Sequence, residues 1–486
     1  TKRFLATVMV LLLVAAFAFA GGEQEQAATG EGRVDLEGES IDMSILGIGG
    51  WIPSELGVVM AEDLFVDYAK ENFGYDVSFS FQEAPFSSLF QKAATSLAAR
   101  EQEFNIIVSD SQWLGAFAEP GWIVQMNDII ENSEVFSQLE WYDPVVRKAY
   151  MTYPDGSDQL WGLPQEGDVL VLYVRQDMFT DPAEQEAFQA EYGWELPQTF
   201  EDWIDVSMDE YEQIAEFFTR PDEDLYGMAY QYAREYDFFS MYYYPYLWST
   251  GGRIWDADDR EITGILNTEN NAESLERMVG AQQWQPSGVN NYGIPQIVDA
   301  FTSGRVATAM QWAAMGAGMM PEGGEDDVLI VPPPAIENNG EMTRIYSIGG
   351  QPWVLNAYND AAHMQVALDF LEWWYLPETQ LEFARRGGNP AVKSVLESDG
   401  FEDIQPWFRA YKYMLTEERA RDFWHEPTYA EMLATQQEAF TAYATGQVDS
   451  AKRALDYAAC EQQRILNEAG RSEIEPPDYC DGLTLE

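Results

Sequence analysis

The feature that most constrains this chain is an unbroken apolar run from Val169 to Val174, preceded by the carboxylates Glu166 and Asp168. Such a run, with an aromatic residue near its end, is typical of a strand buried on both faces. In an extended chain the two carboxylates leave the same face, roughly 6–7 Å apart. Two like charges beside a buried strand are costly unless polar groups meet them. They belong either to a polar site or to a solvated strand entry.

Strands and helices alternate in the first quarter of the chain. Apolar segments predict strands at residues 41–46, 77–81 and 105–110. Pro53 suits the first turn of a helix that ends at Gly74, and Ser87 is a candidate cap for the next helix. The β-α-β-α-β order indicates a parallel sheet, and open α/β sheets bind ligands at the carboxyl ends of their strands.

The segment from Pro164 to Phe179 has the pattern Pro-x-Glu-x-Asp-x-x-x-Leu-Tyr-x-Arg-x-Asp-x-Phe. It resembles the hinge-crossing segment of the solute-binding proteins of carbohydrate ABC importers, the family that includes maltose-binding-protein-like proteins. The resemblance extends in consistent order from about Ile41 to about Leu466. It implies an α/β, two-lobed periplasmic-binding-protein-like fold of type II. Each lobe would be a mostly parallel sheet flanked by helices, with a cleft between the lobes.

The resemblance also implies a division into lobes. Residues 41–164 and 355–399 would form the N-terminal lobe, and residues 165–354 and 400–486 the C-terminal lobe. A strand at 225–229 is expected in the second of these, and Thr199 would cap a helix there.

Two segments precede the lobes. Residues 1–20 have a basic head, an apolar core and a small-x-small end at Ala18 to Ala20, as a secretory signal peptide does. A retained membrane anchor is the alternative, although the apolar run is short for a span. No Cys follows the core, so we expect a secreted or periplasmic protein without a lipid anchor. Residues 21–40 are small, polar and acidic, which predicts a flexible tether.

The resemblance implies ligand contacts at the hinge, at strand ends and at glycine-rich turns. One example is the segment from Phe301 to Trp312, which resembles a Phe-x-x-Gly-x-x-Ala-Met motif whose strand ends at a sugar-facing residue. The family has Trp directly after the glycine pair of the second crossing, whereas this chain has Gln351. The expected ligand-binding residues are Trp51, Asp110, Trp113, Glu166, Asp168, Tyr243, Gln311, Trp312, Gly350, Gln351, Trp353 and Asn389. Core packing is the alternative for Trp51 and Trp113, and most aromatics around Tyr243 must be core.

The net charge of the chain limits the classes of molecule that it can bind. The chain has 27 Lys and Arg against 83 Asp and Glu, a net charge of −56, which argues against nucleic acid and anionic membranes. The scattered carboxylates indicate a strongly hydrated, salt-tolerant surface. Two His are too few for a metal site or a catalytic triad, and we expect no cofactor. Cys460 and Cys480 form either one disulfide or two free thiols.

The sequence therefore predicts a non-enzymatic, monomeric binding protein. It would capture a sugar or oligosaccharide between two lobes and deliver it to the membrane subunits of an ABC importer. A binder of another small solute, such as a peptide, a polyol or a metal chelate, is the first alternative. A secreted glycoside hydrolase is the second, because paired carboxylates in an aromatic cleft also suit an acid and a nucleophile.

Overall fold

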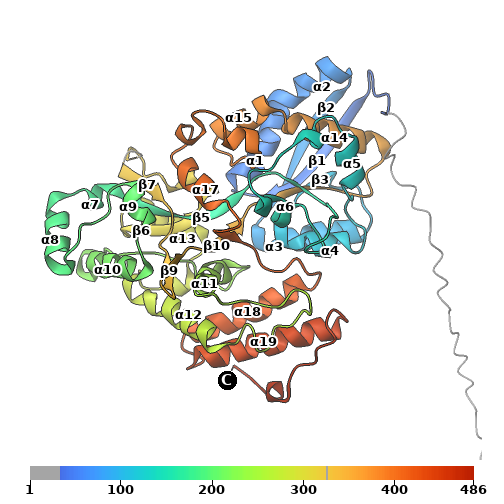
Figure 1. Cartoon of the computed structure of the whole chain (residues 1–486). Helices are drawn as coiled ribbons and strands as arrows, with labels where there is room; N and C mark the ends of the chain where they lie inside the picture. The colour runs from blue at the N-terminus through green and yellow to red at the C-terminus, as the bar shows by residue number, and fades with distance from the viewer. Residues whose placement is uncertain (1–32, 325–326, 486) are drawn as a thin grey trace, which may run out of the picture.

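The computed structural model describes residues 33–324 and 327–485, which form two α/β lobes (Figure 1). The first lobe is blue, cyan and orange in Figure 1, and the second is mainly green, yellow and red. The expected signal peptide and residues 21–32 of the expected tether lie outside the described residues. Within the described ranges, no helix is both long and apolar enough to cross a bilayer.

The first lobe is built on a sheet with strand order β2-β1-β3-β11-β4. Its strands are β1 (Ser40–Ile48), β2 (Asp76–Ala84), β3 (Ile106–Val108), β4 (Leu163–Pro164) and β11 (Pro352–Leu355). β1 is parallel to β2 and β3, while β11 is antiparallel to β3 and β4. The helices are α1 (Ile52–Met60), η1 (Ala61–Phe65), α2 (Val66–Phe73), α3 (Phe86–Ala98), η2 (Ser111–Trp113), α4 (Leu114–Ala118), α5 (Asn127–Asn132), η3 (Phe136–Gln138), α6 (Pro144–Tyr150), α14 (Ala361–Trp374), α15 (Pro377–Arg385) and α16 (Lys393–Leu396).

The second lobe is built around β5 (Asp168–Arg175), the strand that the apolar run predicts. Every residue from Val169 to Val174 is fully buried. The strand order is β12-β10-β5-β6, and β7 also pairs with β5. The other strands are β6 (Thr308–Trp312), β7 (Val328–Val331), β10 (Tyr346–Gly349) and β12 (Ala420–Arg421), with a separate hairpin of β8 (Ile336–Asn338) and β9 (Glu341–Thr343).

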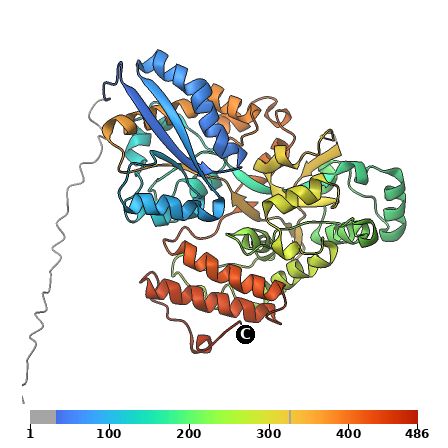
Figure 2. The same ribbon diagram turned by 180° about the vertical axis from the view of Figure 1, so that it is seen from behind.

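Helices cover this second sheet, and α18 and α19 lie side by side at its far end, in red (Figure 2). The disulfide between Cys460 and Cys480 ties the C-terminal segment to α19. The helices are α7 (Gln176–Phe179), α8 (Pro182–Tyr192), α9 (Phe200–Ile204), α10 (Met208–Phe218), η4 (Pro221–Glu223), α11 (Phe238–Ser249), α12 (Glu269–Gly280), η5 (Ala281–Trp284), η6 (Val289–Asn291), α13 (Ile294–Thr302), η7 (Ala313–Met319), η9 (Phe401–Asp403), α17 (Phe408–Met414), α18 (Tyr429–Ala444), α19 (Ala451–Glu468) and η10 (Asp478–Cys480).

The chain passes between the sheets at adjacent points. It leaves the first sheet after β4 and enters the second with β5, and it returns between β10 and β11. The backbone N–H groups of Gln165 and Glu166 both donate to the carbonyl oxygen of Gln351, at 2.8 and 3.2 Å. The Tyr150 hydroxyl donates to the Gly349 carbonyl and accepts from the Asp168 amide. The two crossings therefore form one bonded junction.

Four local expectations differ from the structure. The second sheet is mostly antiparallel, because β5 runs opposite to β6, β7 and β10. The return to the first lobe begins at Pro352, three residues before the expected boundary at 355. Residues 225 and 226 form only isolated bridges, because the next two amides, of Gly227 and Met228, both donate to the Trp284 carbonyl and not to a neighbouring strand. Pro85, not Ser87, is the N-cap of α3.

Part of the expected tether is also packed against the first lobe. Arg33 pairs with Asp369 at 2.5 Å and lies over the Phe73 ring, and Leu36 is buried. An apolar side chain and an arginine with a buried acidic partner fix residues 33–40 despite their polar composition. The expected Thr199 cap is present, in a capping box at the start of α9.

A candidate ligand cavity between the lobes

A cavity of about 300 Å³ lies where the ends of several strands meet. The first lobe contributes residues that follow β1, β2 and β3, and the second contributes the ends of β6 and β10, the start of β5 and residues of α11. This is the place at which α/β sheets bind ligands. The lining residues are Ile48, Gly49, Gly50, Trp51, Pro85, Phe86, Ser87, Asp110, Asp168, Glu235, Asp237, Phe238, Met241, Ile294, Pro295, Trp312, Met315, Gly349, Gly350 and Gln351.

Asp168 opens β5 and is fully buried. Its Oδ1 accepts hydrogen bonds from the backbone amides of Val169 (2.8 Å) and Ala314 (3.1 Å). Within the described residues its Oδ2 has no hydrogen-bond partner. Burial raises the pKa of this carboxyl well above its usual range. The two amides fix one oxygen, which leaves the other for a ligand.

Glu166 lies behind the cavity and does not line it. Its Oε1 accepts a hydrogen bond of 2.5 Å from the indole Nε1 of Trp51, which does line the cavity. Burial first, and the Asp168 carboxylate second, raise the pKa of Glu166 well above its usual range. The structure thus places Glu166 as the residue that orients Trp51.

Asp110 follows β3 and caps η2, accepting from the Gln112 amide at 3.3 Å and the Ser111 hydroxyl at 3.1 Å. Its Oδ2 accepts from the hydroxyl of Tyr236 at 2.6 Å, a hydrogen bond that joins the two lobes. Burial raises the pKa of Asp110 to about 6, although the bond from Tyr236 opposes this change. The carboxyl is therefore already engaged across the closed cavity.

The glycine pair of the second crossing allows close packing beside the cavity. A Cβ on Gly349 would lie 2.9 Å from the Trp312 ring, so this indole packs directly on the backbone. Gly350 has φ +88° and a Cβ there would lie 2.9 Å from the Asp168 amide. Gln351 lines the cavity, and its Oε1 has no partner within the described part of the chain.

The structure brings together six of the twelve expected residues, namely Trp51, Asp110, Asp168, Trp312, Gly350 and Gln351. The other six do not line the cavity. Besides Glu166, they pack in the interior: Trp113 against Phe86 and Phe90, and Trp353 against Phe370 and Trp374.

Three of these six are held by hydrogen bonds elsewhere. The Tyr243 hydroxyl donates to the Asn271 carbonyl, so this ring belongs to the core of the second lobe. Gln311 and Asn389 accept from Gln231 and Trp407 respectively. Gln311 precedes Trp312 on β6, and successive side chains of a strand point to opposite faces.

Sequence reasoning missed several lining residues. The chief one is Asp237, a buried N-cap residue of α11 whose pKa is raised well above its usual range by burial and by Asp110. An acidic residue directly before an aromatic run was the signal that could have identified it. The others are Phe86, Ser87, Glu235, Phe238, Met241, Ile294, Pro295 and Met315, together with backbone-exposing turn residues.

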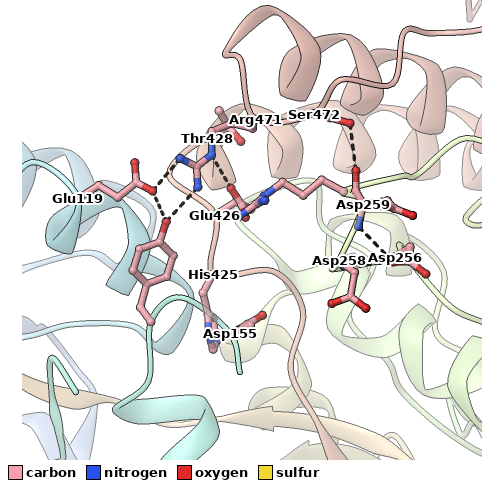
Figure 3. Close-up of polar contacts among 12 residues, drawn as sticks. Glu119, Asp155, Asp256, Asp258, Asp259, His425, Glu426, Thr428, Arg471 and Ser472 are labelled. Atoms are coloured by element: carbon pink, nitrogen blue, oxygen red, sulfur yellow. Dashed lines mark hydrogen bonds and ion pairs between the residues drawn. The ribbon is translucent and has the colours of Figure 1, made fainter. Parts of the chain in front are cut away.

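A second cavity, of about 630 Å³, is also lined by residues of both lobes. His425 lies fully buried between the carboxylates of Asp155 (2.8 Å) and Asp422 (3.2 Å), which raise its pKa to about 10 against the effect of burial. In Figure 3, Arg471 lies between Glu119 of the first lobe and Glu426, at 2.7 and 2.9 Å. The pairs of His425 with Asp155 and of Arg471 with Glu119 connect the two lobes. Within the described residues, no group of three or more His, Cys, Asp or Glu could hold a metal ion.

Two lobes joined by adjacent crossings, with a cavity between them at the strand ends, define a two-lobed solute-binding protein. The chain matches the family model of bacterial extracellular solute-binding proteins over residues 57–381 and belongs to that family. The family gives the chain a solute-binding role, and the two-lobed α/β fold agrees with it.

Solved structures share this fold at low identity. A solute-binding protein of an ABC transporter from Agrobacterium radiobacter, in complex with ribitol, is 19% identical with a TM-score of 0.70, covering 89% of this chain and 100% of that one. Maltose-bound MalE3 of T. maritima is 17% identical (TM-score 0.69; 88% and 100%). The GacH receptor of Streptomyces glaucescens, solved unliganded and with acarbose, is 14% identical (0.66; 88% and 99%).

Proposed function

We propose that this protein captures a small sugar or polyol in the cavity between its lobes and delivers it to the membrane subunits of an ABC importer. The observation that carries the proposal is the meeting of carboxyl groups and aromatic faces at the strand ends of both lobes. Carboxylates accept hydrogen bonds from hydroxyl groups, and aromatic faces pack against the C–H side of a sugar ring. The structural relatives solved with ribitol and with maltose have ligands of this kind.

The cavity volume favours a small ligand. At about 300 Å³ it lies at the lower end of the range of about 300–1,000 Å³ usual for small-molecule sites. A monosaccharide, a polyol or a short oligosaccharide fits this proposal better than a long chain. As a member of an extracellular family, the protein would act outside the cytoplasm. Residues 1–20 would be its export signal, and it would act as a monomer.

A thermal-shift screen of monosaccharides, disaccharides and polyols, followed by calorimetry, tests the proposal. We expect a ligand-dependent rise in melting temperature, and recovery of the ligand chemically intact. Cleavage of a glycoside during the measurement would favour a hydrolase instead. A screen in which no sugar or polyol raises the melting temperature would contradict the proposal.

The same screen allows a test of the central carboxyl. We expect Asp168→Ala to weaken binding of the best ligand by roughly 2–4 kcal/mol, about one and a half to three decades in Kd, because a charge-assisted hydrogen bond is lost. Isothermal titration calorimetry measures this change, and circular dichroism verifies the fold. Unchanged affinity would remove Asp168 from the site.

A further inference from the structure

All the ionisable side chains described in the lining of the ligand cavity are acidic. Its lining includes four carboxyl side chains, those of Asp110, Asp168, Glu235 and Asp237. Among the described residues that line it there is no Lys, Arg or His. Glu235 is exposed, whereas the three aspartates are buried. Buried carboxylates are unfavourable unless a cation or several donors meet them.

The lining also holds few side-chain donors. They are the Trp312 indole, the Gln351 amide and the Ser87 hydroxyl, all uncharged. The indole N–H of Trp51 is already bonded to Glu166. A neutral sugar needs donors as well as acceptors, because every hydroxyl group can do both. An ammonium group only donates, so it matches a lining in which acceptors predominate.

Two buried acceptors in the lining have capacity that the protein does not use. Asp168 is fully buried and Gln351 is 4% exposed. Across the described parts of the chain, neither Asp168 Oδ2 nor Gln351 Oε1 has a hydrogen-bond partner. A buried acceptor without a donor is unfavourable, so a ligand that donates to both stabilises the site.

Two arginines of the second lobe, Arg260 and Arg471, do not line the cavity and are paired with carboxylates. Arg260 and Arg471 both pair with Glu426, and Arg471 also pairs with Glu119. The bond that Asp110 receives across the lobes comes from the neutral hydroxyl of Tyr236. Because no Lys, Arg or His among the described residues lines the cavity, the ligand is the source of positive charge within it.

The aromatic rings in the lining also favour a positively charged ligand. Trp51, Phe86, Phe238 and Trp312 all line the cavity. The face of an aromatic ring attracts a cation, most strongly in Trp, and the effect grows when water is excluded.

We infer that the ligand of this cavity is a sugar or polyol that carries a protonated amine. The inference rests on the proposed function and specifies its substrate class. The ammonium group donates to Asp168 Oδ2 and lies near Asp237, while a hydroxyl group of the same molecule donates to Gln351 Oε1.

Calorimetry with matched ligand pairs tests this inference. Each pair differs by one ammonium group: glucosamine and glucose, galactosamine and galactose, and glucamine and sorbitol. Putrescine provides an amine without a polyol. We expect at least one amine member to bind at least tenfold more tightly than its neutral partner.

Three variants show whether the carboxyls cause this preference. Asp168→Asn keeps an oxygen for the Val169 and Ala314 amides but replaces the unpartnered oxygen with a donor, and Asp237→Asn is the second test should the first variant not fold. Asp67→Asn, exposed on α2, is the charge-matched control. We expect either cavity variant to weaken amine binding by about ten- to a hundredfold, and the control to leave it unchanged.

The outcomes separate this inference from the proposed function. Equal or tighter binding of the neutral members would overturn the inference and leave the proposed function standing. Binding of putrescine alone, or of no sugar or polyol at all, would overturn both. An amine preference that persists in both cavity variants would also overturn it, because the charge would then act from elsewhere.

Discussion

Two aspartates in the cavity wall, Asp110 and Asp168, are placed for binding but destabilise the folded protein. Asp110 and Asp168 each use one oxygen for backbone amides and are held in a setting that disfavours their charge. Such groups stay in a fold because a ligand or a partner lobe meets them, not because they stabilise the empty protein. The site is thus a place where binding and stability are in conflict.

The pH dependence of stability should show this conflict at Asp110. Burial holds its pKa at about 6 in the folded protein, against an ordinary 3.8, so the folded state binds a proton first as the pH falls. The free energy of unfolding therefore rises as the pH falls from about 6 to about 4. Above pH 6 the destabilisation caused by the buried, charged carboxylate is fully present. We expect Asp110→Asn to be more stable than the wild type at neutral pH, by up to about 3 kcal/mol.

Urea unfolding of both proteins at about pH 7.5 and at about pH 4.5 measures this effect. The advantage of the variant should shrink at the lower pH, because the wild-type carboxyl is then neutral as well. An advantage of the same size at both values would show that Asp110 does not titrate in this window.

At the scale of elements, the C-terminal segment depends on a covalent link. Cys460 in α19 and Cys480 in η10 are bonded across a sequence separation of 20 residues, with a Cα–Cα distance of 5.5 Å. Closing a loop of this length lowers the entropy of the unfolded chain. The disulfide also holds η10 next to α19. Without it, only a polar connection would join the two helices.

We expect the double variant Cys460→Ser, Cys480→Ser to lose about 2–4 kcal/mol of unfolding free energy. Chemical unfolding with and without a reducing agent measures the loss. The reducing agent should destabilise the wild type but not the double variant. A wild type that is insensitive to reduction, with the bond demonstrably open, would contradict the expectation.

At the scale of the whole molecule, polar contacts of Arg471 connect the two lobes. Arg471 of the second lobe pairs with Glu119 of the first (Figure 3). It also donates to the Tyr153 hydroxyl at 3.1 Å. These bonds form only when the lobes are close, so they favour the closed form. Partly exposed ion pairs contribute little each, about 0–1 kcal/mol.

We therefore expect Arg471→Gln to lower the population of the closed form and to weaken ligand binding by about two- to fivefold. Small-angle scattering of the unliganded protein should show a larger radius of gyration. Arg409→Gln is the control, because its partner Glu201 lies in the same lobe. A change of equal size in the control would attribute the effect to loss of charge rather than to the contact between lobes.

Much of the architecture could be predicted from local pattern. The run from Val169 to Val174 predicts a strand buried on both faces, and the structure confirms it. Gly74 ends the first helical segment in a left-handed conformation, and Thr199 caps α9. Each of these features depends on neighbours in the sequence, so the sequence contains the information.

The membership of the site was predicted only in part. Trp113 and Trp353 are as suitable for stacking as Trp51 and Trp312, yet they pack in the interior. Every residue of α11 from Phe239 to Ser249 is buried, so helical spacing around Tyr243 could not distinguish a face toward the ligand.

Local sequence determined features such as the buried strand at 169–174 and the capped start of α9, because propensity, capping and apolar runs act over a few residues. The tertiary structure alone decided which carboxyls and rings share one cavity. It also decided that the lining contains no basic side chain among the described residues. Those properties depend on distances between segments as remote as Asp110 and Tyr236, which no local pattern records.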